Sequence, residues 1–147
     1  MDLKEKDFIV VIQCDIVKQR CSGYMCDLWF KNREGGFAAY PADKNYRKMH
    51  MSCSGCSGRA IGRKLGNLAN QLKKKEGLGK DRIVVQFSSC VAQDNYHGPP
   101  CPNLDYMKTI VERVGLDWRE DTVITKNSQR RREEGMYGNP TRPSDDE

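Results

Sequence analysis

The chain has 147 residues and a formal net charge of +5. Hydrophobic residues make up 37% of it and charged residues 31%, a balance that predicts one folded domain and excludes a disordered chain. No aromatic residues interleave with the basic ones, which argues against a nucleic-acid-binding surface. The apolar run behind the charged N-terminus is too short for a signal peptide or a membrane span, so we expect a cytoplasmic protein without membrane contact.

Cysteine is the unusual feature of the composition, because the chain contains seven. Structural disulfides rarely persist in a reducing compartment, and an odd number of cysteines leaves at least one unpaired. A disulfide framework is therefore the weaker interpretation, and metal binding or thiol chemistry is the stronger one. The cysteines are Cys14, Cys21, Cys26, Cys53, Cys56, Cys90 and Cys101.

The first half of the chain predicts two strands and two helices in alternation. A β-branched run over 8–14 predicts a buried strand that ends in a cysteine. A turn then leads into a predicted helix over 24–33. A weaker strand over 47–53 also ends in a cysteine, and apolar residues at helical spacing predict a second helix between Gly58 and Gly77.

The second half continues the alternation. The segment 82–90 predicts the clearest strand, again with a cysteine at its end. A proline at 102 suits the first turn of a third helix, and a fourth strand is expected over 122–125. Residues 1–125 are therefore predicted to form one domain. Residues 126–147 are charged, rich in Gly, Pro, Ser and Asn, and predicted to be a flexible tail.

This order of elements predicts an α/β fold with three layers. About four parallel strands would lie between helices on both faces, in a Rossmann-like or flavodoxin-like arrangement. With the strand order 2-1-3-4, Cys14, Cys53 and Cys90 would line one edge of the sheet within roughly 10 Å. Cys56 and Cys101 would extend from adjacent loops. That edge is where open α/β sheets bind their ligands.

Several thiolates at one place suit a soft metal. Zinc and iron-sulfur clusters both prefer such ligands, so the sequence predicts one of the two as cofactor and leaves open which. Serine hydroxyls at 52, 54, 88 and 89 are expected to hydrogen-bond the sulfur atoms. His50 is expected to be an ordinary hydrogen-bonded side chain. Whether Cys21, Cys26 or His97 are ligands is not decided by the sequence.

The segments VIQC, MSCSGCSGR, FSSC and PPCP resemble the CGGC domain family over about residues 8–125. Members of that family are small prokaryotic proteins regarded as metal binders because of their cysteines and histidines. In this chain the naming motif reads CSGC, and Asn103 stands where many members are expected to carry a histidine. By position in the motifs, the resemblance implies the metal ligands Cys14, Cys53, Cys56, Cys90 and Cys101.

Two other functions stay open at this stage, and with them the question of whether the protein is an enzyme. In a thiol redox protein, Cys53 would attack and Cys56 would resolve, because both flank the start of a helix, and a redox partner protein would be required. In a phosphatase or arsenate reductase, the segment from Cys53 to Arg59 would form a Cys-x5-Arg loop that cradles an oxyanion.

Overall fold

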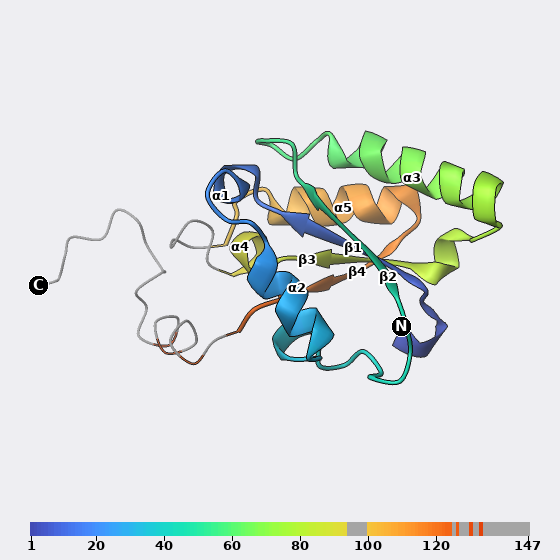
Figure 1. Ribbon diagram of the computed structural model, residues 1–147. Coiled ribbons are helices and arrows are strands. Elements are labelled where there is room, and N and C mark those ends of the chain that lie inside the picture. Colours follow the sequence, from blue (N-terminus) through green and yellow to red (C-terminus); the bar gives the residue numbers. More distant parts are fainter. Residues whose placement is uncertain (94–99, 125, 127–129, 131–132, 134–147) are drawn as a thin grey trace, which may run out of the picture.

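The computed structural model in Figure 1 describes residues 1–93 and 100–124 together with residues 126, 130 and 133. Four strands form one parallel sheet, which confirms the predicted fold class, and their order β2-β1-β3-β4 is the one assumed for the convergence of the cysteines. The strands are β1 (Phe8–Gln13), β2 (Arg47–Ser52), β3 (Ile83–Phe87) and β4 (Asp117–Glu120).

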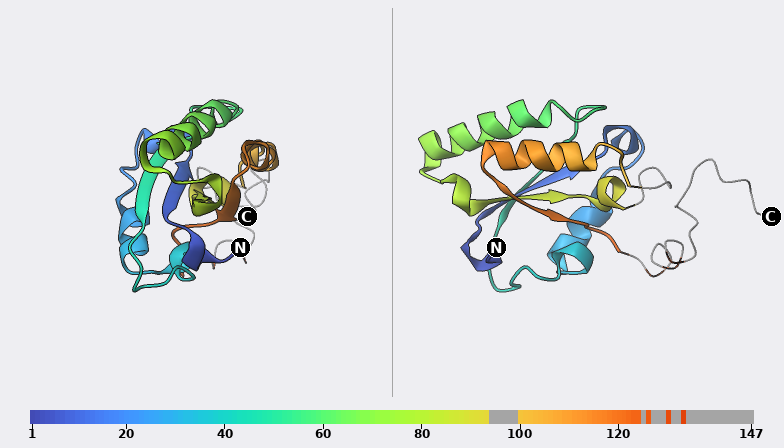
Figure 2. Two further views of the ribbon diagram at one scale, coloured as in Figure 1. Left: turned by 90° about the vertical axis from the view of Figure 1, so that its right-hand side faces the viewer. Right: turned by 180° about the vertical axis from the view of Figure 1, so that it is seen from behind.

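Helices cover both faces of this sheet. On one face α3 (Ile61–Glu76) and α5 (Leu104–Val114) lie side by side, as Figure 2 shows. The other face carries α2 (Tyr24–Lys31) and a 3-10 turn at Gly35–Phe37. Two short helices, α1 (Asp15–Lys18) and α4 (Ser89–Ala92), follow the ends of β1 and β3.

The central strand β1 explains why both faces are covered. All six of its residues are buried, and alternate side chains of a strand point to opposite faces. Val10 and Ile12 pack in the cluster beneath α3 and α5. Ile9 and Val11 pack in the other cluster, with Phe37 among their neighbours. A strand that is apolar on both faces must be the middle of a three-layer fold.

Two predicted strand boundaries were wrong. The fourth strand is Asp117–Glu120 rather than 122–125, and Thr122 follows it as a buried residue. β4 lies at the edge of the sheet and all its residues are polar or aromatic, so no apolar run marks it. The third strand ends at Phe87, and Cys90 lies in the short helix α4.

The predicted tail over 126–147 lies outside the described residues except at three single positions. Within the described part of the chain, none of the helices has the length and apolar character that a membrane crossing requires.

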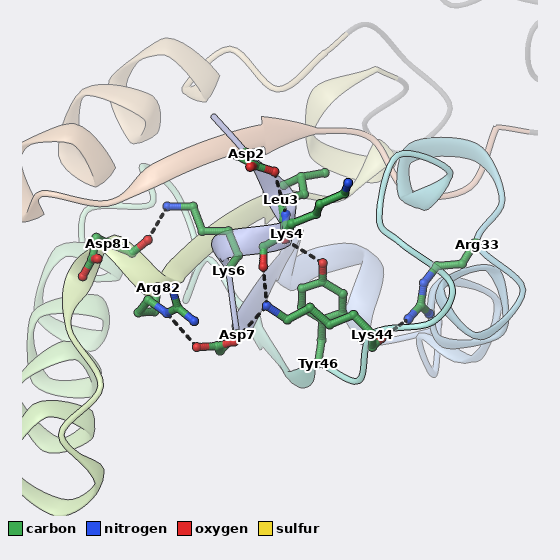
Figure 3. Close-up of polar contacts among 10 residues, drawn as sticks. All are labelled: Asp2, Leu3, Lys4, Lys6, Asp7, Arg33, Lys44, Tyr46, Asp81 and Arg82. Carbon is green, nitrogen blue, oxygen red and sulfur yellow. Dashed lines mark hydrogen bonds and ion pairs between the residues drawn. The ribbon is translucent and has the colours of Figure 1, made fainter.

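At the amino end of the sheet, charged side chains pair across segments that are distant in sequence (Figure 3). Asp7, just before β1, accepts a hydrogen bond from Arg82 Nε at 2.7 Å and forms an ion pair with Lys44 Nζ at 3.0 Å. The Nζ of the buried Lys6 donates to the carbonyl oxygen of Asp81 at 2.7 Å. These pairs tie the starts of β1 and β3 to the loop before β2.

Candidate thiol site

The carboxyl end of the sheet is built from cysteines that leave neighbouring strands together. The pairing of β1 with β2 continues one residue further, because the Cys53 N–H donates to the Gln13 carbonyl oxygen at 2.9 Å. On the other side of β1, the Ser88 N–H donates to the Ile12 carbonyl oxygen at 2.9 Å. Cys14 follows Gln13 directly, so Cys14 and Cys53 enter the same edge, as predicted.

Cys90 reaches this edge from α4. Its Sγ accepts a hydrogen bond from the backbone N–H of Cys14 at 3.3 Å, and its thiol donates to Ser88 Oγ at 3.4 Å. Burial raises the pKa of Cys90 to about 11, although these two hydrogen bonds oppose the shift, and the nearby thiols of Cys26 and Cys14 raise it further. Cys90 is therefore a neutral thiol at pH 7 in the metal-free protein.

Cys101 lies at the same edge in the segment before α5. Its N–H donates to the Val91 carbonyl oxygen at 2.8 Å, which fixes this segment against α4. Burial raises the pKa of Cys101, and the thiols of Cys14, Cys53 and Cys56 raise it further. Thiols from two other segments, the end of β1 and the loop after β2, thus lie close enough to Cys101 to influence its pKa.

The five cysteines at this edge differ in solvent exposure. Cys14 and Cys53 are each only 8% exposed, whereas Cys56 is exposed, and Cys90 and Cys101 are half-buried. Cys56 lines a surface pocket together with Arg59, but Cys53 is not among the described residues that line it. The arrangement therefore gives no support to Cys53 as a nucleophile against an anion held by Arg59.

Cys26 joins this end of the sheet, a role that the sequence left undecided. Its Sγ lies 3.2 Å from Thr122 Oγ1 and 3.7 Å from Ser88 Oγ, all in buried surroundings. A cysteine in the first turn of a helix that follows a strand was the available signal, because such turns lie at the carboxyl edge of a parallel sheet. By contrast, Cys21 is exposed and its Sγ accepts a hydrogen bond from the Gly23 N–H at 3.4 Å.

The expected serine–sulfur contacts are met in part. Ser88 contacts two sulfur atoms, as described above, which confirms the prediction for that residue. The hydroxyl of Ser52 instead donates to the Asp15 carboxylate at 2.9 Å, and that of Ser89 to the Asp121 carboxylate at 3.4 Å. A carboxylate is a stronger acceptor than a neutral sulfur atom, so these hydroxyls turn toward it.

The structure tests the prediction for one of the two histidines. His50 is hydrogen-bonded, as expected: its Nε2 accepts from Lys48 Nζ at 2.7 Å. Burial lowers the pKa of His50 to about 4, and the charge of Lys48 lowers it further. His97 lies outside the described residues.

The cysteines at this edge, Cys14, Cys53, Cys56, Cys90 and Cys101, suit a soft metal, because cysteine thiolates are preferred ligands of zinc and iron-sulfur clusters. Their present arrangement is not that of a finished metal site. Over residues 1–93 and 100–124, no three side chains of His, Cys, Asp or Glu are placed so that they could hold one ion together.

Fold and site together define a class of protein: a three-layer parallel α/β domain with a group of cysteine thiols at the carboxyl edge of its sheet. The chain belongs to the CGGC domain family, whose model matches residues 8–122. The resemblance found in the sequence motifs is thereby confirmed. Searches of curated proteins and of solved structures gave no match.

Proposed function

We propose that this protein binds a thiophilic metal, either zinc or an iron-sulfur cluster, at the carboxyl edge of its sheet. The supporting observation is that cysteines distant in sequence lie together there: Cys90 Sγ accepts a hydrogen bond from the Cys14 backbone N–H, and the thiols of Cys14, Cys53 and Cys56 raise the pKa of Cys101. In a cytoplasmic setting these thiols stay reduced and available as ligands. The ligands come from the set Cys14, Cys53, Cys56, Cys90 and Cys101.

Electrostatics supports a cation at this place. Thiolates that lie close together repel one another, and the raised pKa values of Cys90 and Cys101 reflect this repulsion in addition to burial. A bound metal reverses the effect, because it stabilises every neighbouring thiolate at once. Metal binding should therefore release protons and weaken as the pH falls.

Electrostatic effects link the five cysteines. The thiols of Cys14, Cys53 and Cys56 raise the pKa of Cys101, and that of Cys14 raises the pKa of Cys90, so a tetrahedral zinc site would take its four sulfur ligands from these five. Cys90 contacts the backbone of Cys14 from the side. Binding requires the side chains to turn toward a common centre, and the exposed Cys56 has the most freedom to do so.

The test is metal content after purification without oxygen and without a metal-affinity tag. We expect metal in a stoichiometric ratio to the protein. Zinc would leave the protein colourless, whereas an iron-sulfur cluster would absorb at about 400 nm and contain iron and sulfide. Cys53→Ser and Cys90→Ser should each lower the metal content, and Cys21→Ser is the matched control. Unchanged metal content in both site variants would refute a shared site.

Thiol redox chemistry is the second candidate, and one observation favours it in an altered form. Cys56 is exposed whereas Cys53 is 8% exposed, so the accessible attacking thiol would be Cys56 and the resolving thiol Cys53, the reverse of the order expected from the sequence. Purified protein without metal, combined with rapid alkylation of Cys56 and loss of both thiols on mild oxidation, would favour this function and a redox partner protein.

A further inference from the structure

A surface pocket between the end of β2 and the start of α3 stands apart from the buried thiols. Its lining includes the thiol-bearing Cys56 and three basic side chains, Arg59, Arg63 and Lys64. Its described lining residues include no carboxylate. A concave surface with three positive charges, no carboxylate and an exposed sulfur atom attracts anions.

The two arginines of this pocket are available for a ligand. Arg59 and Arg63 are exposed, and neither forms an ion pair with another described residue. At the far end of α3, by contrast, Arg47 pairs with the Glu76 carboxylate at 2.6 Å. The Nζ of Lys64 is anchored beside the pocket, where it donates to the Ser52 carbonyl oxygen at 3.1 Å.

We propose that this pocket binds a small oxyanion group, a phosphate, sulfate or carboxylate, and holds the molecule that carries it against the thiol of Cys56. Guanidinium groups recognise such anions through paired N–H donors, and Arg59 and Arg63 provide two of them. The ammonium group of Lys64 adds a third positive charge. The pocket thereby favours molecules with an anionic group over neutral ones as reaction partners of the Cys56 thiol. The pocket shares Cys56 with the proposed metal site, but its anion contacts come from Arg59, Arg63 and Lys64, so the inference does not depend on metal binding.

The charge selectivity of alkylation at Cys56 tests the proposal in reduced, metal-free, full-length protein. Iodoacetate carries a negative charge and iodoacetamide is neutral, but the same thiolate attacks the CH2 carbon of both reagents and displaces iodide. The ratio of their rates therefore does not depend on the fraction of thiolate. We expect this ratio, measured by mass spectrometry of the labelled peptides, to be about fivefold higher at Cys56 than at the exposed Cys21.

Variants and competing anions identify the groups involved. The double variant Arg59→Ala and Arg63→Ala should reduce the ratio at Cys56 to that at Cys21. Lys74→Ala with Lys75→Ala removes the same charge from exposed positions at the other end of α3 and should leave the ratio unchanged. Inorganic phosphate or succinate should slow the reaction of Cys56 with iodoacetamide in the unaltered protein, and the more effective of the two names the preferred group.

The proposal fails if the two cysteines show equal ratios, if the double arginine variant keeps the high ratio, or if neither anion protects Cys56. Metal content of the double arginine variant separates this result from the proposed function. It should equal that of the unaltered protein, since neither arginine is a ligand. In the unaltered protein, a full metal content without charge selectivity at Cys56 overturns only the anion pocket. Charge selectivity at Cys56 in an unaltered protein that binds no metal overturns only the metal site.

Discussion

The two ends of the sheet carry side chains of opposite kinds. At the amino end, Lys6, Asp7 and Arg82 find oppositely charged or carbonyl partners within 3.0 Å. At the carboxyl end lie thiols with raised pKa values, and Gln13 Oε1 is buried there without a hydrogen-bond partner in the described part of the chain. At the amino end these charges are paired, whereas the carboxyl end keeps one buried polar atom without a partner among the described residues.

This difference indicates that the amino end contributes to the stability of the fold and the carboxyl end to ligand binding. Paired charges at the amino end have little left to offer a ligand, so their role is to hold the strands in register. At the carboxyl end, the buried amide oxygen of Gln13 costs free energy unless something binds there, and the thiols are available as ligands. The comparison predicts that variants at the two ends differ in kind: carboxyl-end variants change metal content, and amino-end variants change the free energy of unfolding.

The largest expected effect is on metal content after Cys14→Ser. Cys14 is buried, and its thiol influences the pKa of both Cys90 and Cys101, so its loss should reduce bound metal to less than about one-tenth of stoichiometric. Elemental analysis of the purified variant measures this. Lys6→Ala is the control from the opposite end and should keep full metal content. Metal loss in both variants would remove the distinction between the two ends.

Lys6→Ala should instead lower the free energy of unfolding by about 2 kcal/mol. The side chain of Lys6 is 5% exposed, and its Nζ lies 2.6 Å from Asp117 Oδ2 and 2.7 Å from the Asp81 carbonyl oxygen. Truncation leaves both acceptors without this donor. Urea unfolding of metal-free protein measures the change. The exposed Lys4, whose backbone N–H rather than its side chain bonds Asp2, provides the control Lys4→Ala, with an expected change near zero.

A pH dependence should arise from His50 on β2. Its pKa is lowered from 6.5 to about 4 by burial and by Lys48, so between these values the unfolded chain binds a proton that the folded protein does not. Stability is then fully present above pH 6.5 and decreases as the pH falls toward 4, by on the order of 2 kcal/mol. Urea midpoints across this range measure the slope. His50→Gln should flatten it, and an unchanged slope would assign the effect to other groups.

The smallest expected effect is that of Asp7→Asn. The hydrogen bond from Arg82 and the charge of Lys44 lower the pKa of Asp7, so its contribution is present above the ordinary value of 3.8 and is lost as the pH falls below it. Because the partners are partly exposed, the loss at pH 7 should be less than about 1 kcal/mol. The same unfolding assay in high salt should reduce the difference further. A larger, salt-insensitive loss would mean that the amino end is more than a set of surface pairs.

Much of the fold was predictable because local pattern and global order agree. The β-branched segment that became β1 is apolar on both faces, which identifies a central strand without any tertiary information. The edge strand β4 was misplaced for the opposite reason. Asp117–Glu120 contains no apolar run, and only pairing with β3 makes it a strand.

The site shows the same division. By itself, the sequence predicted a parallel sheet with Cys14 and Cys53 at the ends of two strands, because periodicity and the alternation of elements are read along the chain. The pairing of these two strands as neighbours was an assumption that the structure bears out. Only the tertiary structure showed that Cys26 contacts Thr122, which is 96 residues away in the sequence. It also showed that Cys56 lines a basic pocket while Cys53 is buried. Burial, and the pKa shifts that follow from it, depend on neighbours supplied by distant segments, and no pattern along the chain records them.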